Sequence, residues 1–288
     1  MSDGSIVVQG RELSPADIQG IRDLITARPK GTRWTLSREL CERWDWRTGK
    51  GLLKDMACRS LLNKLDEKGL IKLPPKGRRP MKGPQAVVAV DIDPIRARLA
   101  ELTPLYITPV AAGSPDARLL HQLLSSHHYL GFRTNVGEWM GYLVRDRLGR
   151  LVACAVFGSA AWKTAPRDAF IGWDAAVRAR RLGGIANNNR YLILPWVQVP
   201  HLASHILGLL ARRIRADWIG KYAYPLVLLE TFVDRSRFRG TCYRAANWQC
   251  VGQTQGRSRQ DRYNNMSVPI KDIYLYPLSA RFREELTR

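Results

Sequence analysis

The 288-residue chain carries 46 lysine and arginine residues against 25 aspartate and glutamate residues, a net charge of +21. This excess favours an anionic partner, with nucleic acid first and an acidic membrane surface second, although a basic surface kept for solubility is the alternative. No apolar run reaches 18 residues, no signal peptide opens the chain, and the five cysteines are scattered, which excludes a membrane span, a disulfide framework and a zinc ribbon. We therefore expect a reduced, cytoplasmic protein.

Residues 10–83 are predicted to form a winged helix-turn-helix domain. Ser14 and Pro15 are typical of a helix start, and isoleucine and leucine recur at helical spacing after them. A second helix is expected in GTRWTLSRELCERWDW (31–46), and a third runs from about Leu52 to Lys68, before the helix stop Gly69. LIKLPPKGRRPMKGP (70–84) then predicts a short strand and a basic loop. Three helices, a strand and a basic loop are the element order of a winged helix.

Charged and polar side chains of this domain predict DNA contacts. Arg59 and Asn63 lie opposite the apolar face of the third predicted helix, where they can read a major groove. The wing supplies phosphate or minor-groove contacts from Lys76, Arg78, Arg79 and Lys82. Residues 1–83 hold 18 basic and 10 acidic residues, a net charge of +8. A protein-binding winged helix with a solvated charged face is the alternative.

Residues 84–103 are predicted to be a connector, with a short strand in AVVAVDIDP (86–94) and helical turns in IRARLAEL (95–102). The rest of the chain, 104–288, is predicted to be an α/β domain. Its expected elements are a strand at 105–111, a helix at 114–130, a hairpin at 137–160, a strand at 187–197, an amphipathic helix at 201–218, a strand at 224–233, a short helix at 239–247, strands at 249–254 and 270–278, and a terminal helix at 280–288.

This order of elements resembles the GNAT acyltransferase fold, a mixed sheet with helices. Gly240, Tyr243, Asn247 and Trp248 partly match the family's C-terminal motif of a small residue, a tyrosine and Gly-Phe, with Asn and Trp in place of the last two. The resemblance implies an acyl-CoA donor, but the matching loop PWVQVPHLASHIL (195–207) has no glycine to let a pyrophosphate approach the backbone. The cofactor is therefore unknown, with acyl-CoA one possibility.

A longer resemblance covers Pro104 to about Leu278. The segments SSHHYLGF, NNNRYLILPWV, LLETFVD, FRGTCYRAANW and KDIYLYPL are similar to the family of the Druantia anti-phage protein DruA, which also includes a domain found beside transposase genes. The resemblance implies a role in phage defence or mobile elements, with other defence or transposition proteins as possible partners.

Three residues near the end of the chain are candidates for catalysis. In an acyltransferase-like site, the Tyr243 phenol donates a proton to the departing thiolate. Glu230 lies inside an apolar strand, where a carboxylate needs a partner, and Asp234 follows at the strand end. Alternation predicts Glu230 on one face of the strand and Thr231 on the other. Packing of Tyr243 and an ion pair of Glu230 with an arginine are the structural alternatives.

Other motifs favour binding. Asn187 to Arg190, with Asn189 and Arg190 as candidate nucleic-acid contacts, are expected just before a strand, where an asparagine-rich turn explains them equally well. GQTQGRSRQDRYNN (252–265) is typical of a loop that contacts phosphates through Arg257 and Arg259, unless it is merely solvated.

Histidine pairs give the weakest candidates for a site. His201 and His205 have the spacing that places two side chains on one helix face, so they are weak metal-ligand candidates, and a structural role is the alternative.

Three functions follow from these patterns. The leading hypothesis is a DNA-binding protein that transfers a group to a base, which must be unpaired to be reached. The alternatives are a metal- or tyrosine-dependent DNA strand cleaver and a non-catalytic DNA-binding module. An RNA partner is not excluded, because a basic surface does not distinguish the two polymers.

Overall fold

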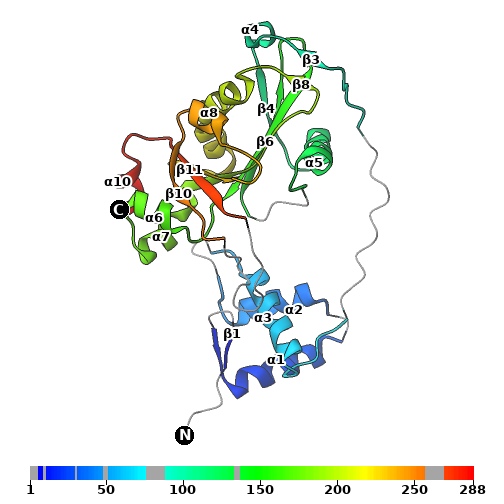
Figure 1. Cartoon of the computed structure of the whole chain (residues 1–288). Coiled ribbons are helices and arrows are strands. Elements are labelled where there is room, and N and C mark those ends of the chain that lie inside the picture. Colours follow the sequence, from blue (N-terminus) through cyan, green and yellow to red (C-terminus); the bar gives the residue numbers. More distant parts are fainter. Residues whose placement is uncertain are drawn as a thin grey trace. The chain divides into compact units, whose positions relative to one another are not determined.

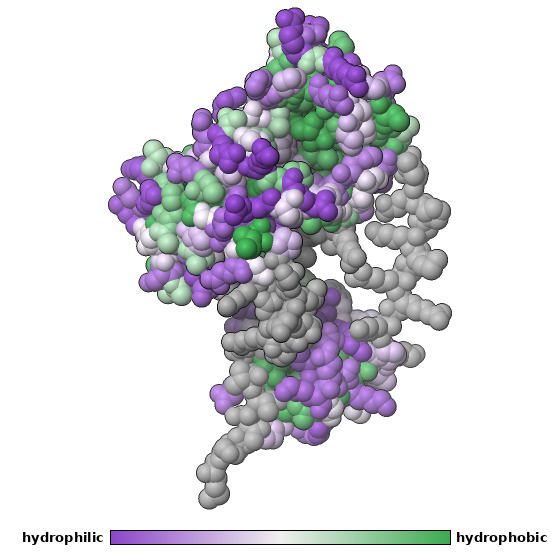
Figure 2. All heavy atoms as spheres, viewed as in Figure 1, coloured by the Kyte–Doolittle hydropathy of each residue, from purple (hydrophilic) through white to green (hydrophobic). Residues whose placement is uncertain are grey.

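The computed structural model describes residues 6–8, 11–29, 31–47, 51–75, 88–132, 137–256 and 269–288. The chain divides into two compact units, residues 1–85 and 86–288 (Figure 1), and each is described by itself. Hydrophilic side chains cover most of the face seen in Figure 2, where hydrophobic side chains gather in separate groups. Within the described ranges, no helix has both the length and the apolar character needed to cross a bilayer.

The first unit is a small hairpin with three helices packed around one core. A capping box joins Ser14 and Asp17 at the start of the first helix, as the sequence predicts for this position. Leu61 and Leu65 of the third helix are fully buried, because they repeat on one face at helical spacing. The elements are β1 (Ile6–Val8), β2 (Arg11–Leu13), α1 (Pro15–Ala27), α2 (Arg33–Arg43) and α3 (Asp55–Glu67).

The end of the first unit differs from the predicted winged helix in its details. Helix α3 begins at Asp55 instead of Leu52, and residues 68–75 form no strand, although Ile71 and Leu73 are buried against the helices. The predicted wing residues Lys76 to Lys82 lie outside the described residues. The winged helix therefore stays a prediction.

The second unit is built on a seven-stranded mixed sheet with the order β10-β11-β9-β7-β6-β5-β4. All neighbours are antiparallel except β7 and β9, which run parallel. The strands of the sheet are β4 (Tyr106–Val110), β5 (Trp139–Arg145), β6 (Leu151–Ser159), β7 (Ile185–Ile193), β9 (Leu228–Asp234), β10 (Gln249–Gln253) and β11 (Lys271–Pro277).

The helices of this unit cover both faces of the sheet, and they are α5 (Pro115–His127), α6 (Ala165–Ile171), α7 (Ala175–Arg181), α8 (Leu202–Tyr222), α9 (Thr241–Ala245) and α10 (Phe282–Thr287). Tyr142 donates to Asp217 of α8, whereas its neighbour Gly141 lies against Leu120 of α5. Because successive strand residues point to opposite faces, α5 and α8 cover opposite faces, as Figure 1 shows.

The predicted α/β fold is confirmed, with two differences along the chain. Residues 88–94 are not a strand; instead β3 (Ile95–Arg96) pairs in parallel with β8 (Val197–Gln198), and α4 (Leu99–Leu102) follows, so this stretch belongs to the second unit. Residues 160–184, for which no element was predicted, contain α6, α7 and the short 3-10 helix Leu182–Gly184.

Candidate functional site

A cleft opens where strands β7 and β9 separate. Their parallel pairing ends at Asn187 and Glu230, although β7 continues to Ile193 and β9 to Asp234. The resulting cavity has a volume of about 670 Å³, within the range of small-molecule sites. Its lining comes from strands β7, β9 and β11, from helices α5, α8 and α9, and from the turns next to them: His127–Leu130, Asn187–Ile193, Pro195, Ala203, Thr231–Val233, Phe238, Gly240–Tyr243 and Lys271. The lining contains Arg190 and Lys271 but no aspartate or glutamate, so its net charge is positive.

The cleft reaches both faces of the sheet. Tyr191 points toward α8, because its hydroxyl donates to the carbonyl oxygen of Ala203 at 2.7 Å. Arg190, the next residue back, points toward the α5 face, where its Nε donates to the carbonyl oxygen of Gly131 at 2.8 Å. Groups from opposite faces therefore meet in the gap between the two strands.

The three asparagines lie within β7, as the strand predicted at 187–197 has them, and not in the turn that was the other explanation for them. The register of β7 against β6 shifts between Asn188 and Arg190, so Asn189 lies at a bulge. The side-chain amide nitrogen Nδ2 of Asn188 donates to the backbone carbonyl oxygens of Val156 and Arg190, at 3.1 and 3.2 Å. These bonds satisfy backbone groups at the irregularity, which is why asparagine is tolerated inside this strand.

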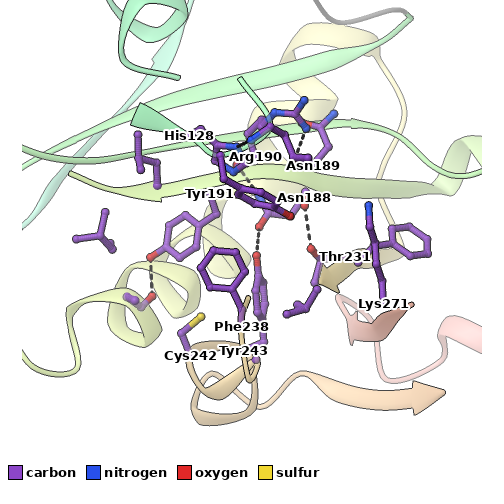
Figure 3. Close-up of a pocket in the computed structure, with 18 of the residues that line it drawn as sticks. His128, Asn188, Asn189, Arg190, Tyr191, Thr231, Phe238, Cys242, Tyr243 and Lys271 are labelled. Carbon is purple, nitrogen blue, oxygen red and sulfur yellow. Dashed lines mark hydrogen bonds between the residues drawn. The ribbon is translucent and has the colours of Figure 1, made fainter. Parts of the chain in front are cut away.

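Tyr243 lies in the wall of the cleft, on helix α9. Its hydroxyl donates to Oδ1 of Asn188 at 2.8 Å, and the Thr231 hydroxyl donates to the carbonyl oxygen of Asn188 at 2.9 Å (Figure 3). Burial raises the pKa of Tyr243 well above its ordinary value. The phenol therefore keeps its proton at physiological pH, and it is suited to donate a hydrogen bond but not to attack as a phenolate.

Glu230, the second candidate for catalysis, points to the other face of the sheet from Thr231 and does not line the cleft with Tyr243. Its carboxylate accepts from Nη1 of Arg167 at 2.9 Å and from the amide of Ala161 at 2.7 Å, and both charged side chains are fully buried. Burial raises the pKa of Glu230 even though Arg167 acts against this. The arrangement is that of a buried ion pair between β9 and α6.

Asp234 ends β9 outside the cleft lining and shapes the following turn. Its Oδ1 accepts from the hydroxyl and the amide of Ser236, at 2.7 and 3.0 Å. These bonds hold the pKa of the Asp234 carboxyl below its ordinary value. The residue therefore positions the turn that leads to Phe238.

With this geometry in view, the model of the family of the Druantia protein DruA matches residues 76–278. The chain belongs to this family. The match covers the cleft and all of its described lining. No curated protein sequence matches the chain.

Solved structures similar to this DruA-family chain include two forms of a polyamine acetyltransferase. Spermidine/spermine N-acetyltransferase SpeG from Vibrio cholerae with manganese ions is 11% identical, with a TM-score of 0.39, covering 62% of this chain and 96% of that one. Spermidine N-acetyltransferase from the same organism, with CoA and spermine, is 10% identical, with a TM-score of 0.40, covering 60% and 95%. Similarity at this level says nothing about the chemistry of the DruA-family chain.

The residues before α8 do not fit a coenzyme A pyrophosphate. Positions 199–204 contain no glycine, so a side chain stands at every backbone group that a phosphate would approach. Val197 and Gln198, which precede these positions, already pair with β3. No step of the chemistry is therefore assigned to coenzyme A.

The histidines are distributed over two places. His201 precedes α8 with a φ of +64°, so it is not a helical residue and the shared-face argument for His201 and His205 does not apply. Across the described ranges, no three His, Cys, Asp or Glu side chains are grouped to hold a metal ion. His128 lines the cleft, and burial together with Arg190 lowers its pKa to about 4. His128 is therefore neutral at physiological pH.

The predicted contacts of the first unit are already engaged within the chain. Arg59 pairs with Asp55 at 3.1 Å, and Oδ1 of Asn63 accepts from Nη1 of Arg33 at 2.7 Å. Six further predicted contacts, of the wing and of the loop after β10, lie outside the described residues: Lys76, Arg78, Arg79, Lys82, Arg257 and Arg259.

Sequence reasoning missed the partner of Glu230 and the helix that carries it. The segment TAPRDAFIG has Pro166 near a helix start, Asp168 in the first turn and Gly172 at the end, with a φ of +87°, which are ordinary helix signals. It also missed Tyr129 and Phe238, which line the cleft although both side chains are exposed.

Proposed function

We propose that this chain is a DNA-modifying group transferase that acts in phage defence or in the biology of mobile elements. In this proposal the cleft between β7 and β9 is the reaction site, and Tyr243 is the hydrogen-bond donor to the leaving atom. The observation that carries the proposal is a buried, protonated phenol in the wall of a cationic cleft without carboxylates. Such a donor stabilises negative charge as it develops on a leaving group.

The chemical step needs an activated acyl donor and an exocyclic amine of a base. The amine nitrogen attacks the acyl carbon, and the bond from this carbon to the leaving atom breaks with its electron pair. Tyr243 hydrogen-bonds the leaving atom and delivers a proton to it. Because its pKa is raised, the phenol regains a proton at once, and the proton that the amine loses balances the exchange.

The DNA part of the proposal rests on charge. The net charge of +21 exceeds what solubility needs, and residues 84–288 carry +13 of it, from 28 basic and 15 acidic residues. Arg190 and Lys271 bring positive charge to the cleft itself. In this proposal the first unit contributes Arg59 as a further DNA contact, and binding weakens steeply with added salt.

The test is intact-mass analysis of nucleosides from cells that express wild type, Tyr243→Phe or Tyr106→Phe. Tyr106 is the matched control, because it is an exposed tyrosine on β4 outside the cleft. We expect a new nucleoside mass with wild type and Tyr106→Phe, reduced by about 100-fold or more with Tyr243→Phe. No new mass with wild type, in cells where the protein binds DNA, overturns the proposal.

A non-catalytic DNA-binding module is the second candidate. It is favoured by the bond between Tyr243 and Asn188, which satisfies the phenol without any ligand. This candidate predicts that Tyr243→Phe leaves DNA binding and phage protection unchanged, whereas Arg59→Ala weakens binding. The strand-cleaver hypothesis gains no support, because a buried phenol with a raised pKa is a poor nucleophile toward a phosphate.

A further inference from the structure

The mouth of the cleft is formed by two turns that lie far apart in the sequence. In the first, the amide of Gly131 donates to the carbonyl oxygen of His128 at 2.7 Å, and Arg190 ties the turn to β7. In the second, the amide of Phe238 donates to the carbonyl oxygen of Asp234 at 2.9 Å. Both turns are therefore held by hydrogen bonds before any ligand arrives.

These turns bring aromatic rings together at the opening. Tyr129 and Phe238 line the cleft but are 37% and 49% exposed, so they lie where the cleft meets solvent. Their ring centroids are 5.2 Å apart at an interplanar angle of 60°. His128 stacks on Tyr129 with centroids 4.9 Å apart, and the Arg237 guanidinium lies 5.1 Å from the centre of the Tyr129 ring. Tyr129 is thus braced, while nearly half of Phe238 faces outward.

The charges around the rings favour a polyanion. The charges of Arg190, Arg237 and Asp234 lie close enough to the Tyr129 hydroxyl to influence its pKa. Lys271 lines the same cleft. The single carboxylate of this group is bonded to Ser236. Three cations against one anion leave the mouth positively charged, which suits the phosphates on either side of a bound nucleotide.

We propose that Phe238, braced by Tyr129, is a stacking platform for an unpaired nucleobase of single-stranded DNA. This inference rests on the proposed function, because it names the substrate class of the same cleft. A half-exposed aromatic ring beside cations is the arrangement that binds single strands, since every base has a π face. A paired base inside a duplex has both faces covered by its neighbours, so the ligand is an unpaired or extruded base.

The test uses purified full-length protein and an oligonucleotide with 2-aminopurine, whose fluorescence falls when it stacks. Binding is measured for the single strand and for its blunt duplex. For Phe238→Ala we expect single-strand affinity to fall about 5- to 150-fold, with loss of quenching and little change for the duplex. Phe238→Trp should retain both signals. Trp162→Ala is the matched control, because Trp162 is 57% exposed in the same unit but outside the cleft lining.

Unchanged affinity and quenching in Phe238→Ala overturn the platform, and so does an equal loss in Trp162→Ala. If Phe238→Ala does not fold, Phe238→Leu keeps the apolar volume without the π face, and quenching equal to wild type then overturns the proposal. The assay needs no donor and forms no product, so it is independent of the nucleoside test. Stacking without a new nucleoside overturns only the proposal that the protein is a transferase. A new nucleoside without stacking overturns only the proposal that Phe238 is a stacking platform.

Discussion

Replacing Arg167 is expected to destabilise the second unit far more than replacing its partner Glu230 by the neutral glutamine. Arg167→Met removes the bonds that Arg167 donates to Glu230, Asp168 and the carbonyl oxygen of Ala161 at 2.7 to 3.0 Å. Breaking a fully buried ion pair from one side costs about 3–5 kcal/mol of unfolding free energy. Glu230→Gln keeps an acceptor for the Ala161 amide, and Arg167 keeps Asp168, so its cost is about 1–3 kcal/mol.

The effect of pH sharpens this prediction. The pKa of Glu230 is raised in the folded protein, so the fold binds a proton that the unfolded chain has already lost. Stability from this group is therefore greatest below the ordinary pKa of about 4.5 and falls as pH rises through the folded value. Arg167→Met removes the positive charge and the hydrogen bond that lower the pKa of Glu230, so the folded pKa is higher in the variant. The variant therefore loses stability up to a higher pH than wild type does. Its deficit relative to wild type should therefore grow as pH rises through the folded value of the wild type.

Urea unfolding at a series of pH values above 4.5 measures these differences, and Arg145→Met is the matched control. The Arg145 pair with Asp116 is 3.7 Å long with both side chains partly exposed, so its loss should cost under about 1 kcal/mol. Equal deficits for Arg167→Met and Arg145→Met would refute the reasoning. If Glu230→Gln folds normally yet abolishes the new nucleoside, the structural role assigned to Glu230 is also wrong.

Two further predictions concern the cleft. At Gly240, where φ is +67°, an added methyl group overlaps the Tyr274 ring. Gly240→Ala should therefore lower the melting temperature and reduce the free energy of unfolding by about 1–3 kcal/mol. Gly220→Ala is the control, because a methyl group there enters open space within α8, and it should not lower the melting temperature. His128 has a folded pKa of about 4, below its ordinary pKa of 6.5, so the unfolded chain binds a proton that the folded protein does not. This difference lowers the stability of wild type as pH falls from 6.5 to 4. His128→Asn should therefore lose less stability than wild type over this range. Urea midpoints across this range check it, and parallel losses in both proteins contradict it.

Alternation and helical spacing predicted most of the second unit. The strands around 139–159, 228–234 and 271–277 are apolar runs or hairpins with clear turns, and the structure has them. Alternation also separated Glu230 from Thr231, and their side chains do bond on opposite faces, to Arg167 and to Asn188. Local patterns determine which face a side chain takes, so these features are visible in a single sequence.

Partners in space could not be predicted in this way. Arg167 and Glu230 are 63 positions apart, and nothing in either segment identifies the other. The asparagines of β7 have a turn-like composition, but Asn188 satisfies two backbone carbonyl groups at a bulge, so tertiary contacts override local preference. Tyr129 and Phe238 meet only because the turns after α5 and β9 reach the same opening.

The mouth of the cleft has a kinetic consequence for a two-substrate reaction. The turns that carry Tyr129 and Phe238 lie where the cleft meets solvent. Two molecules that enter past these turns follow each other through the same opening, so the second molecule blocks the exit of the first. Initial-rate measurements should therefore follow an ordered addition, and the product nearer the mouth should leave first.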